Sequence, residues 1–205
     1  EATLGKAAAK YCKKKGWPFT TCYHTHFPDY ISKRVAQFLP FLKQPVKKLA
    51  IKIIRDFHAR SQALFIATQS LEDELKSWGF TTPMKRLTRG VNLDIFYPGH
   101  VEILPELKSP VALYVGRIAI EKNLEAFLKM DWDGSMLIVG HGPDLEKLQK
   151  AYPHAVFVGK KIGKELGDHF RRADVYVFPS KTDTFGMVLT EAMCCGLPLA
   201  GYDVT

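Results

Sequence analysis

The segment from Pro179 to Pro198 combines a polar loop, a glycine turn and a predicted helix, a pattern that is typical of a ligand site. Its pattern predicts a helix from Met187 to Cys195, and Gly186 comes directly before that helix. Because Gly186 has no Cβ, backbone N–H groups of the first helical turn can approach a ligand closely. The positive end of the helix dipole then faces the ligand, which favours a phosphate group. This stretch therefore predicts a diphosphate site.

Two carboxylates flank that glycine, Asp183 before it and Glu191 after it. Glu191 follows Met187 by one helical turn, so its side chain lies on the same face and points back toward the phosphates. Either carboxylate could accept hydrogen bonds from sugar hydroxyls. The alternative is that Asp183 caps a turn and Glu191 is a solvated helix residue, and the pair alone leaves both interpretations open.

Two cations lie in a loop on the same edge of the predicted sheet. Arg117 and Lys122 follow the apolar run at residues 111–115, which predicts a strand. Ligands of open parallel sheets bind at the carboxyl ends of the strands, and two cations there suit a diphosphate. We also assign to the nucleotide site the glycines that end apolar strands in this half of the chain: Gly116, Gly140 and Gly159.

Two other motifs invite a cofactor assignment that the surrounding sequence contradicts. Asp131-Trp132-Asp133 matches a D-x-D metal motif, but it precedes a strand and so belongs to the opposite edge of the sheet, where it predicts a turn. Gly140-His141-Gly142 follows a strand, but Leu145 stands where a dinucleotide fingerprint needs a third small residue. We therefore expect no metal and no cofactor other than the donor substrate.

With these residues in place, the segment resembles the E-x7-E signature of retaining glycosyltransferases of the family 4 group, which have two Rossmann-like domains (the GT-B architecture). Here it stands as Asp183-x7-Glu191, with Asp in place of the usual first Glu. GRIAIEKN, residues 116–123, is similar to the family's GR-x-x-x-x-KN phosphate clamp and has the same spacing. Within the group, the sequence resembles GDP-mannose-dependent mannosyltransferases and sulfoquinovosyl or glycolipid transferases.

The resemblance implies a role for each of these residues. Arg117 and Lys122 would stabilise the departing diphosphate, Glu191 would hold the ribose and Asp183 the sugar. His24, in YHTHFPDY, matches the first His of the family's YHT segment and would lie beside the donor sugar. His26 is a weaker candidate on the acceptor side. The other donor contacts that the resemblance implies surround the glycine turn: Phe185, Gly186, Met187 and Val188.

Apolar runs alternate with amphipathic stretches along the whole chain, which predicts an α/β fold with parallel sheets and helices on both faces. Pro98, Gly99, Pro105 and Pro110 place a domain boundary near residues 98–109. We expect two incomplete Rossmann-like domains, the acceptor-side one at 1–100 and the nucleotide-sugar one at 101–205. Because the chain starts inside a predicted helix and has no initiator Met, we expect it to be a piece of a longer protein.

The composition agrees with a soluble globular protein: 46% of the residues are hydrophobic and 12% aromatic, with no apolar run long enough to span a membrane and no signal-peptide core. The four cysteines show no C-x-x-C spacing, so neither a disulfide framework nor a zinc site is predicted. A reducing, cytoplasmic location fits best.

The positive charge lies in the first half of the chain. Residues 1–100 hold 17 basic and 7 acidic residues, whereas residues 101–205 hold 12 and 14. Residues 31–60 contain eight Lys or Arg and one acid, Asp56, and we expect Pro40 and Pro45 to break them into two helices. Such a stretch suits an anionic membrane, such as the inner face of the plasma membrane. It equally suits a helix that packs on a sheet with solvated lysines. Nucleic acid is disfavoured because no base-reading motif accompanies the charge.

Together these features predict a retaining, metal-independent glycosyltransferase that moves a hexose from a nucleotide diphosphate sugar to a lipid or glycan hydroxyl. Two alternatives remain at this point. One is a nucleotide-sugar epimerase of related architecture, and the other is a fragment that binds nucleotide without catalysis.

Overall fold

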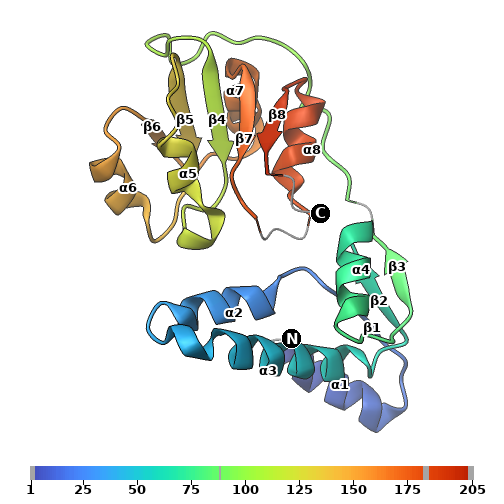
Figure 1. Cartoon of the computed structure of the whole chain (residues 1–205). Helices are drawn as coiled ribbons and strands as arrows, with labels where there is room; N and C mark the ends of the chain where they lie inside the picture. Colours follow the sequence, from blue (N-terminus) through green and yellow to red (C-terminus); the bar gives the residue numbers. More distant parts are fainter. Residues whose placement is uncertain (1–2, 88, 182–184, 203–205) are drawn as a thin grey trace. The chain divides into compact units, whose positions relative to one another are not determined.

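The computed structural model describes residues 3–87, 89–181 and 185–202. It forms two compact units, which meet along the chain between Arg89 and Gly90; Phe185 groups with the first unit and Gly186 with the second. Each unit contains one sheet with its own helices (Figure 1). Both sheets are parallel, so the predicted α/β fold is confirmed.

The first unit is built on a three-stranded sheet in the order β1-β2-β3. The strands are β1 (Thr20–Cys22), β2 (Ala63–Ile66) and β3 (Met84–Arg86). Its helices are α1 (Thr3–Lys15), α2 (Phe27–Ala36), the short 3₁₀ helix η1 (Pro40–Leu42), α3 (Lys43–His58) and α4 (Gln69–Ser77). The buried core joins the central strand β2 to α3 and α4 through Ile54, Leu64, Ile66, Leu71 and Leu75.

The break predicted inside residues 31–60 occurs at Pro40 but not at Pro45. The chain leaves α2 after Ala36 and turns through η1, which starts at Pro40. Pro45, by contrast, is the third residue of α3 and does not interrupt it. The first four N–H groups of a helix have no intrahelical acceptor, so a residue without an N–H is tolerated there. The expectation that Pro45 breaks the chain was wrong for this reason.

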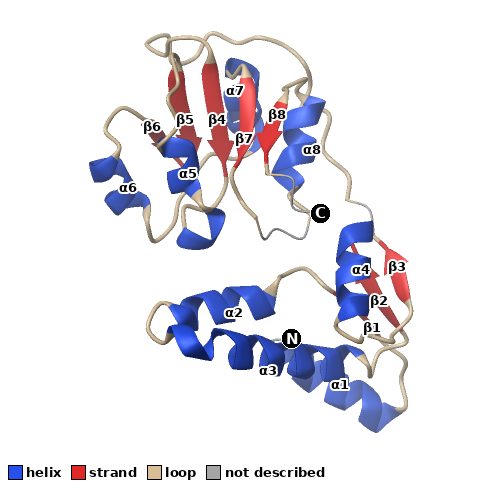
Figure 2. Ribbon diagram, in the orientation of Figure 1, coloured by secondary structure: helices blue, strands red, loops and turns tan. Residues whose placement is uncertain are grey.

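The second unit contains a five-stranded sheet in the order β6-β5-β4-β7-β8. The strands are β4 (Val111–Val115), β5 (Ser135–Val139), β6 (Val156–Gly159), β7 (Val175–Phe178) and β8 (Leu199–Gly201). Its helices are η2 (Ile120–Lys122), α5 (Leu124–Leu128), α6 (Leu145–Ala151), α7 (Gly163–Arg172) and α8 (Met187–Cys194). Figure 2 shows helices on both faces of this sheet.

The central strand β4 explains why both faces are covered. All five of its residues are buried, and successive side chains point to opposite faces. Leu113 belongs to the core that includes Phe170 of α7, whereas Tyr114 belongs to the core that includes Phe127 of α5. A strand that is apolar at every position requires a helical layer on each side.

The two units divide after Arg89, whereas the sequence placed the domain boundary after residue 100. Residues 90–100 resemble a linker, but Phe96 is buried in the core of the second unit. Arg171 of α7 also donates a hydrogen bond of 2.9 Å to the carbonyl of Ile95. This long-range packing attaches the segment to the second unit.

A charged cluster connects three helices of the first unit. The two ring nitrogens of His26 lie 2.9 Å from Oδ2 of Asp29 in α2 and 2.7 Å from Oε2 of Glu74 in α4. Lys47 of α3 places its Nζ 2.6 Å from Oδ1 of Asp29. Trp78 packs edge-on against the His26 ring, with 5.4 Å between centroids.

The cluster stabilises the charged forms of its members. Burial opposes a charge on His26, but the hydrogen bonds to Asp29 and Glu74 outweigh it and raise the pKa of His26 to about 9. The hydrogen bond from His26, followed by that from Lys47, holds the pKa of Asp29 well below its usual range. His26 is therefore a cation near neutral pH.

This assignment predicts how the stability of the first unit depends on pH. Because the folded pKa of His26 lies above its unfolded value of about 6.5, its contribution is complete below that pH and is lost as the pH rises through about 9. We expect His26→Gln to lower the free energy of unfolding by about 1 to 3 kcal/mol at pH 6 and much less at pH 10. Denaturant unfolding followed by tryptophan fluorescence measures this.

His100→Gln serves as the control, because His100 is exposed and lies outside the cluster. It should leave the pH dependence unchanged. An equal loss of stability in His26→Gln at both pH values would show that the imidazole is neutral in the folded protein.

Candidate functional site

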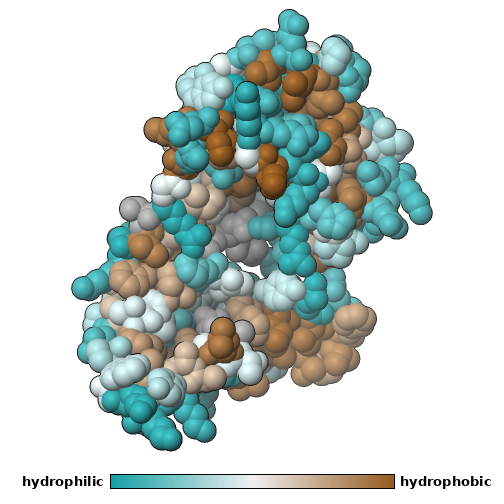
Figure 3. Space-filling model, turned by 180° about the vertical axis from the view of Figure 1, so that it is seen from behind, coloured by the Kyte–Doolittle hydropathy of each residue, from teal (hydrophilic) through white to brown (hydrophobic). Residues whose placement is uncertain are grey.

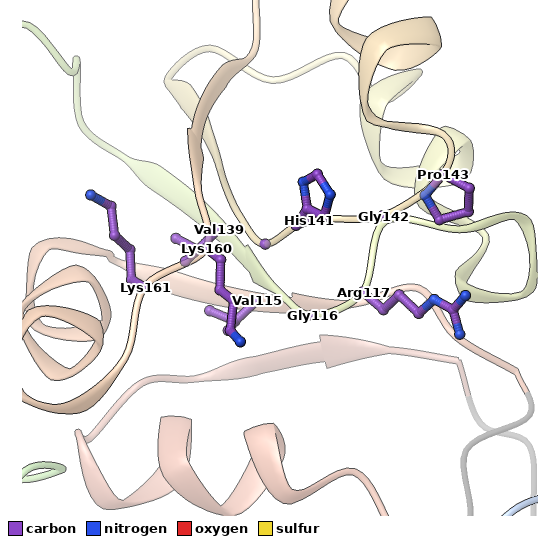
Figure 4. A pocket seen from close by; sticks show the side chains of 10 residues that line it. Val115, Gly116, Arg117, Val139, His141, Gly142, Pro143, Lys160 and Lys161 are labelled. Carbon is purple, nitrogen blue, oxygen red and sulfur yellow. The ribbon is translucent and has the colours of Figure 1, made fainter.

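A cavity of about 640 Å³ lies at the carboxyl edge of the second sheet, where β4, β5 and β6 end. This volume falls in the range of small-molecule sites. Figure 4 shows that the lining side chains come from three loops, one after each strand. The lining residues are Val115, Gly116, Arg117, Val139, Gly140, His141, Gly142, Pro143, Lys160 and Lys161.

Backbone hydrogen bonds join these loops beyond the ends of the strands. The N–H of Gly116 donates to the carbonyl of Val139 at 3.0 Å, and the N–H of Gly140 donates to the carbonyl of Gly159 at 2.8 Å. The N–H of Ile118 continues the series to the carbonyl of His141 at 3.1 Å. The wall of the cavity is therefore an extension of the sheet.

The packing of these loops against one another explains two of their glycines. A Cβ on Gly140 would lie 1.9 Å from the carbonyl oxygen of Gly116, and one on Gly142 would lie 2.0 Å from that of Ile118. Both positions thus require glycine before any ligand binds. Gly159 differs, because its φ of +74° favours glycine although the space around it is open. The close approach of the two loops therefore explains why residue 140 is a glycine, whether or not a nucleotide also approaches it.

Three cations surround the cavity: Arg117, Lys160 and Lys161. The Arg117 side chain is 56% exposed, and its guanidinium lies 3.9 Å from the carboxylate of Glu121. A hydrogen bond from β4 fixes its backbone, because the hydroxyl of Tyr114 donates to the carbonyl of Arg117 at 2.8 Å. The loop is therefore anchored while the guanidinium remains accessible.

Lys122, the second predicted cation, does not line this cavity. It ends η2 and precedes Asn123, which adopts the left-handed conformation with φ of 55°. The Asn123 amide donates to the carbonyl of Pro179 at 3.1 Å. This bond ties the loop that carries Lys122 to the start of the segment that leads to Gly186.

The glycine turn has the predicted form. Gly186 is the N-cap of α8 with φ of 65°, which favours glycine, and its carbonyl accepts a hydrogen bond from the N–H of Leu189 at 2.8 Å. Gly196, with φ of +80°, follows the C-terminus of the helix. Met187 and Val188 form the first turn.

Glu191 is half-buried on α8, and this burial raises the pKa of its carboxyl group. Within the described part of the chain, its side chain makes no hydrogen bond or ion pair. A half-buried carboxyl group in this setting can accept hydrogen bonds from hydroxyl groups of a ligand.

The predicted site residues do not all meet in one place. Gly116, Arg117 and Gly140 meet in the cavity. Gly159, Lys122 and the residues from Gly186 to Glu191 belong to the same sheet edge or its helices but do not line the cavity. His24 and Phe185 group with the first unit. Asp183 lies outside the described residues. The roles assigned to all of them remain predictions.

Sequence reasoning missed His141, Lys160 and Lys161, which also line the cavity. A signal was available for the two lysines. They follow the apolar strand AVFVG directly, just as Arg117 follows β4, and so had to lie at the same sheet edge.

The D-x-D segment has the predicted location. Asp131 and Asp133 precede β5, at the edge of the sheet opposite the cavity. Trp132 between them donates its indole N–H to the carbonyl of Pro110 at 2.8 Å. This turn therefore packs against the start of β4.

The two histidines of the HTH segment belong to the first unit and have different partners. His24 follows β1, and its Nδ1 lies 2.6 Å from Nη2 of Arg89. His26 is part of the charged cluster. Ligand atoms of His26, Asp29 and Glu74 lie within 4.8 Å of one another, as a metal site would need. Lys47 and the imidazolium already supply positive charge there, so the cluster is an ion-pair network.

Comparison with known proteins places both halves of the chain in glycosyltransferase families. Residues 100–205 match the family model of Glycosyl transferases group 1, and residues 1–95 match that of Glycosyltransferase Family 4. A GDP-mannose-dependent alpha-mannosyltransferase of Mycobacterium tuberculosis is 29% identical over 209 residues, which cover 98% of this chain and 53% of the relative.

An alpha-monoglucosyldiacylglycerol synthase of Acholeplasma laidlawii is 29% identical over 225 residues, which cover 97% of this chain and 56% of the relative. The chain thus spans about half the length of these two relatives. The structure of a sucrose-phosphate synthase from Thermosynechococcus elongatus superposes with a TM-score of 0.74 at 23% identity, covering 98% of this chain and 54% of that one. The fold is thus that of GT-B glycosyltransferases, and the chain belongs to the group 1 glycosyltransferases, as its sequence motifs indicated.

Proposed function

We propose that the whole protein transfers a hexose from a nucleotide diphosphate sugar to a hydroxyl group of a lipid or glycan, with retention of configuration and without a metal ion. The observation that carries this proposal is the cavity at the carboxyl edge of the second sheet, surrounded by Arg117, Lys160 and Lys161. Family membership and the mannosyltransferase relative, which is named for its GDP-mannose dependence, support the same donor class.

The donor occupies the second unit in this proposal, and the first unit forms the acceptor side. Arg117 and Lys122 neutralise the diphosphate, and backbone N–H groups at the start of α8 add the positive end of a helix dipole. Gly186, the N-cap of α8, has no side chain that could cap these N–H groups. Glu191 accepts hydrogen bonds from the ribose and Asp183 from the sugar.

The chemistry follows from charge that develops on the leaving group. As the bond between the sugar's C1 and the phosphate oxygen breaks, negative charge grows on the diphosphate, and fixed cations stabilise it. The new bond from C1 to the acceptor oxygen forms on the same face of the sugar. A phosphate oxygen of the leaving group takes the acceptor's proton, so no protein carboxylate is needed as a base.

Neither alternative function has equal support. The relatives named above are a transferase and a synthase, and nothing among them indicates an epimerase. A fragment that binds nucleotide without catalysis differs from the proposal only in turnover. Release of the donor's nucleoside diphosphate in the presence of an acceptor separates the two.

Arg117→Ala tests the cavity. Removal of a charged hydrogen-bond partner costs about 1.5 to 3 kcal/mol, so the Kd for a nucleoside diphosphate should rise by at least about tenfold in calorimetry. Lys150→Ala, on the exposed face of α6, is the matched control and should leave the affinity unchanged. Equal affinities in wild type and Arg117→Ala would remove the cavity from the donor site.

Removal of metal ions tests the catalytic proposal. Because protein cations take the place of Mg²⁺, we expect EDTA to leave the rate of transfer by the whole protein unchanged. The measurement is sugar transfer from a nucleotide sugar before and after chelation. A loss of activity that Mg²⁺ or Mn²⁺ restores would contradict metal independence.

We further propose that the whole protein is peripheral and meets an anionic membrane at its cytoplasmic face through residues 31–60. None of the described helices has the length and apolar character needed to cross a bilayer. The turn between α2 and α3 instead exposes large apolar side chains: Phe38 is 84% exposed and Phe41 74%. Figure 3 shows a hydrophobic area over this turn.

Basic residues flank the turn, as interfacial binding requires. Lys33 and Arg34 lie in the last turn of α2, and Lys43, Lys48 and Lys52 are exposed on α3. Lys47 is excluded from this set, because it is ion-paired with Asp29 and lies over the Trp78 ring. The synthase relative, whose name includes diacylglycerol, supports a lipid acceptor.

The membrane proposal predicts binding that depends on both apolar and charged side chains. Phe38→Ser with Phe41→Ser should reduce co-sedimentation with vesicles that contain phosphatidylglycerol. The triple variant Lys43→Glu, Lys48→Glu and Lys52→Glu should abolish it, because each lysine contributes about 1 kcal/mol to binding at the membrane surface. Binding of the wild type should weaken from 0.1 M to 1 M salt, as the Debye length falls from about 10 Å to about 3 Å.

Lys76→Glu, on α4 and away from this turn, is the control and should sediment like the wild type. Sedimentation that neither set of substitutions changes would show that the α2–α3 turn is an ordinary solvated surface. A soluble glycan would then be the better acceptor class.

A further inference from the structure

A second cavity, of about 1020 Å³, lies wholly within the first unit. One face of α1 and one face of α3 line it, together with residues that come just before β1 and β2. It therefore lies at the edge where the strands of the first sheet begin. Ligands of parallel sheets ordinarily bind at the opposite edge, where the strands end. None of the residues that line this cavity belongs to the donor site proposed above.

The packing of α1 on α3 forms the walls of this cavity. The two helices lie side by side (Figure 1), and a Cβ on Gly5 of α1 would lie 3.7 Å from the ring of Phe57 in α3. Ala9, one turn after Gly5, is buried and lines the cavity. Lys6 and Lys10 directly follow these two small residues in the sequence, and both line the cavity as well.

The lining of the cavity is strongly basic. Lys6, Lys10 and Lys13 follow one another at spacings of four and three residues, so their side chains share one face of α1. Arg60 adds a fourth cation from the segment before β2. Among the residues that the structure describes, no acid forms an ion pair with any of these four side chains.

One acid accompanies the four cations. Asp56 also lines the cavity, and its Oδ1 lies 3.9 Å from Nε of Arg55. The lining therefore carries three more positive than negative charges (4 − 1 = 3). Like charges three or four residues apart on a helix repel one another, so a bound anion would stabilise this arrangement. A phosphate monoester carries about two negative charges at pH 7, and a carboxylate only one, so the phosphate offsets more of the excess.

The cavity also offers apolar surface to a ligand. Trp17 is 59% exposed and Ile53 is 46% exposed, and both line the cavity. The indole is held in place, because the backbone N–H of Trp17 donates to the carbonyl of Cys12 at 2.9 Å. Its ring also meets the Tyr11 ring edge-on, with 5.9 Å between centroids. Large apolar side chains beside cations suit a ligand that has an apolar group next to its anionic group.

We propose that this cavity binds a phosphate monoester of an apolar alcohol. The phosphate contacts the four cations, and the apolar group packs against Trp17 and Ile53. Two sources share this chemistry, namely the headgroup of phosphatidic acid in a membrane and a soluble phosphorylated metabolite. The proposal goes beyond the function proposed above, because it needs neither the donor cavity nor the exposed turn between α2 and α3.

Calorimetry with hexyl phosphate, a soluble probe that has both groups, tests the site on the whole protein. We expect saturable binding of one molecule, and Lys10→Glu should raise the Kd by at least about tenfold. Lys14→Glu is the matched control, since Lys14 is exposed on the same helix and does not line the cavity. It should change the Kd by less than about threefold, because salt screens a charge outside the site. Unchanged thermal unfolding shows that both variants are folded.

The apolar part of the site has its own test. Trp17→Ala should raise the Kd for hexyl phosphate by about fivefold or more and leave that for methyl phosphate unchanged, because only the hexyl chain reaches the indole. Arg117→Ala should bind hexyl phosphate like the wild type. If Arg117→Ala weakens this binding as much as Lys10→Glu does, the probe occupies the donor cavity and the proposal is wrong.

Vesicles of phosphatidylcholine with and without phosphatidic acid distinguish the two sources. Phe38→Ser with Phe41→Ser is the parent for this experiment, so that the exposed turn does not contribute. If Lys10→Glu, added to this parent, reduces co-sedimentation with phosphatidic acid, the ligand is the lipid headgroup. If only hexyl phosphate binding responds to Lys10→Glu, the ligand is a soluble phosphate ester. The proposal is overturned if hexyl phosphate shows no saturable binding, or if its Kd is equal in wild type and Lys10→Glu.

Discussion

The candidate site depends on how closely the loops after β4 and β5 approach each other. The carbonyl of Gly116 occupies the position that a Cβ of Gly140 would need, and the carbonyl of Ile118 does the same at Gly142. An alanine at either position would force the loops apart, because no flexible side chain is available to yield. The hydrogen bonds that link the loops would be strained as well, and the cavity would lose its wall.

The close approach of the loops also fixes the backbone that carries the cations. Arg117 needs a rigid backbone if its guanidinium is to meet a diphosphate without a large loss of entropy, and the Tyr114 hydroxyl provides one from inside the sheet. Asn123 extends the fixed region to Pro179 and so to the segment ahead of α8. Its left-handed backbone explains an asparagine there, since that residue tolerates the conformation better than most. Two segments more than fifty residues apart are thus tied by one side-chain bond.

The sequence predicted features that depend on local pattern. The apolar run of β4 predicts a strand that is buried on both faces, and Gly186 predicts the turn before α8. Each prediction depends on only a few neighbouring residues. Long-range packing was not accessible in this way. Phe96 joins the second unit through contacts with α7, which lies about seventy residues away in the sequence. Lys47 pairs with Asp29 only because α2 and α3 pack together, so its charge could not be assigned to a surface in advance.

The same limit applies most strongly to the two histidines of YHTHFPDY. Residue type and spacing place both on one segment after β1, and nothing nearby in the sequence distinguishes their protonation states. The distinction comes from Arg89 and Glu74, which other strands and helices deliver to the same sheet edge. Two carboxylates favour the charged form of an imidazole, whereas a neighbouring guanidinium disfavours it. The fold therefore makes His26 a structural cation and gives His24 a different environment, and the sequence motif alone indicates only where the two can lie.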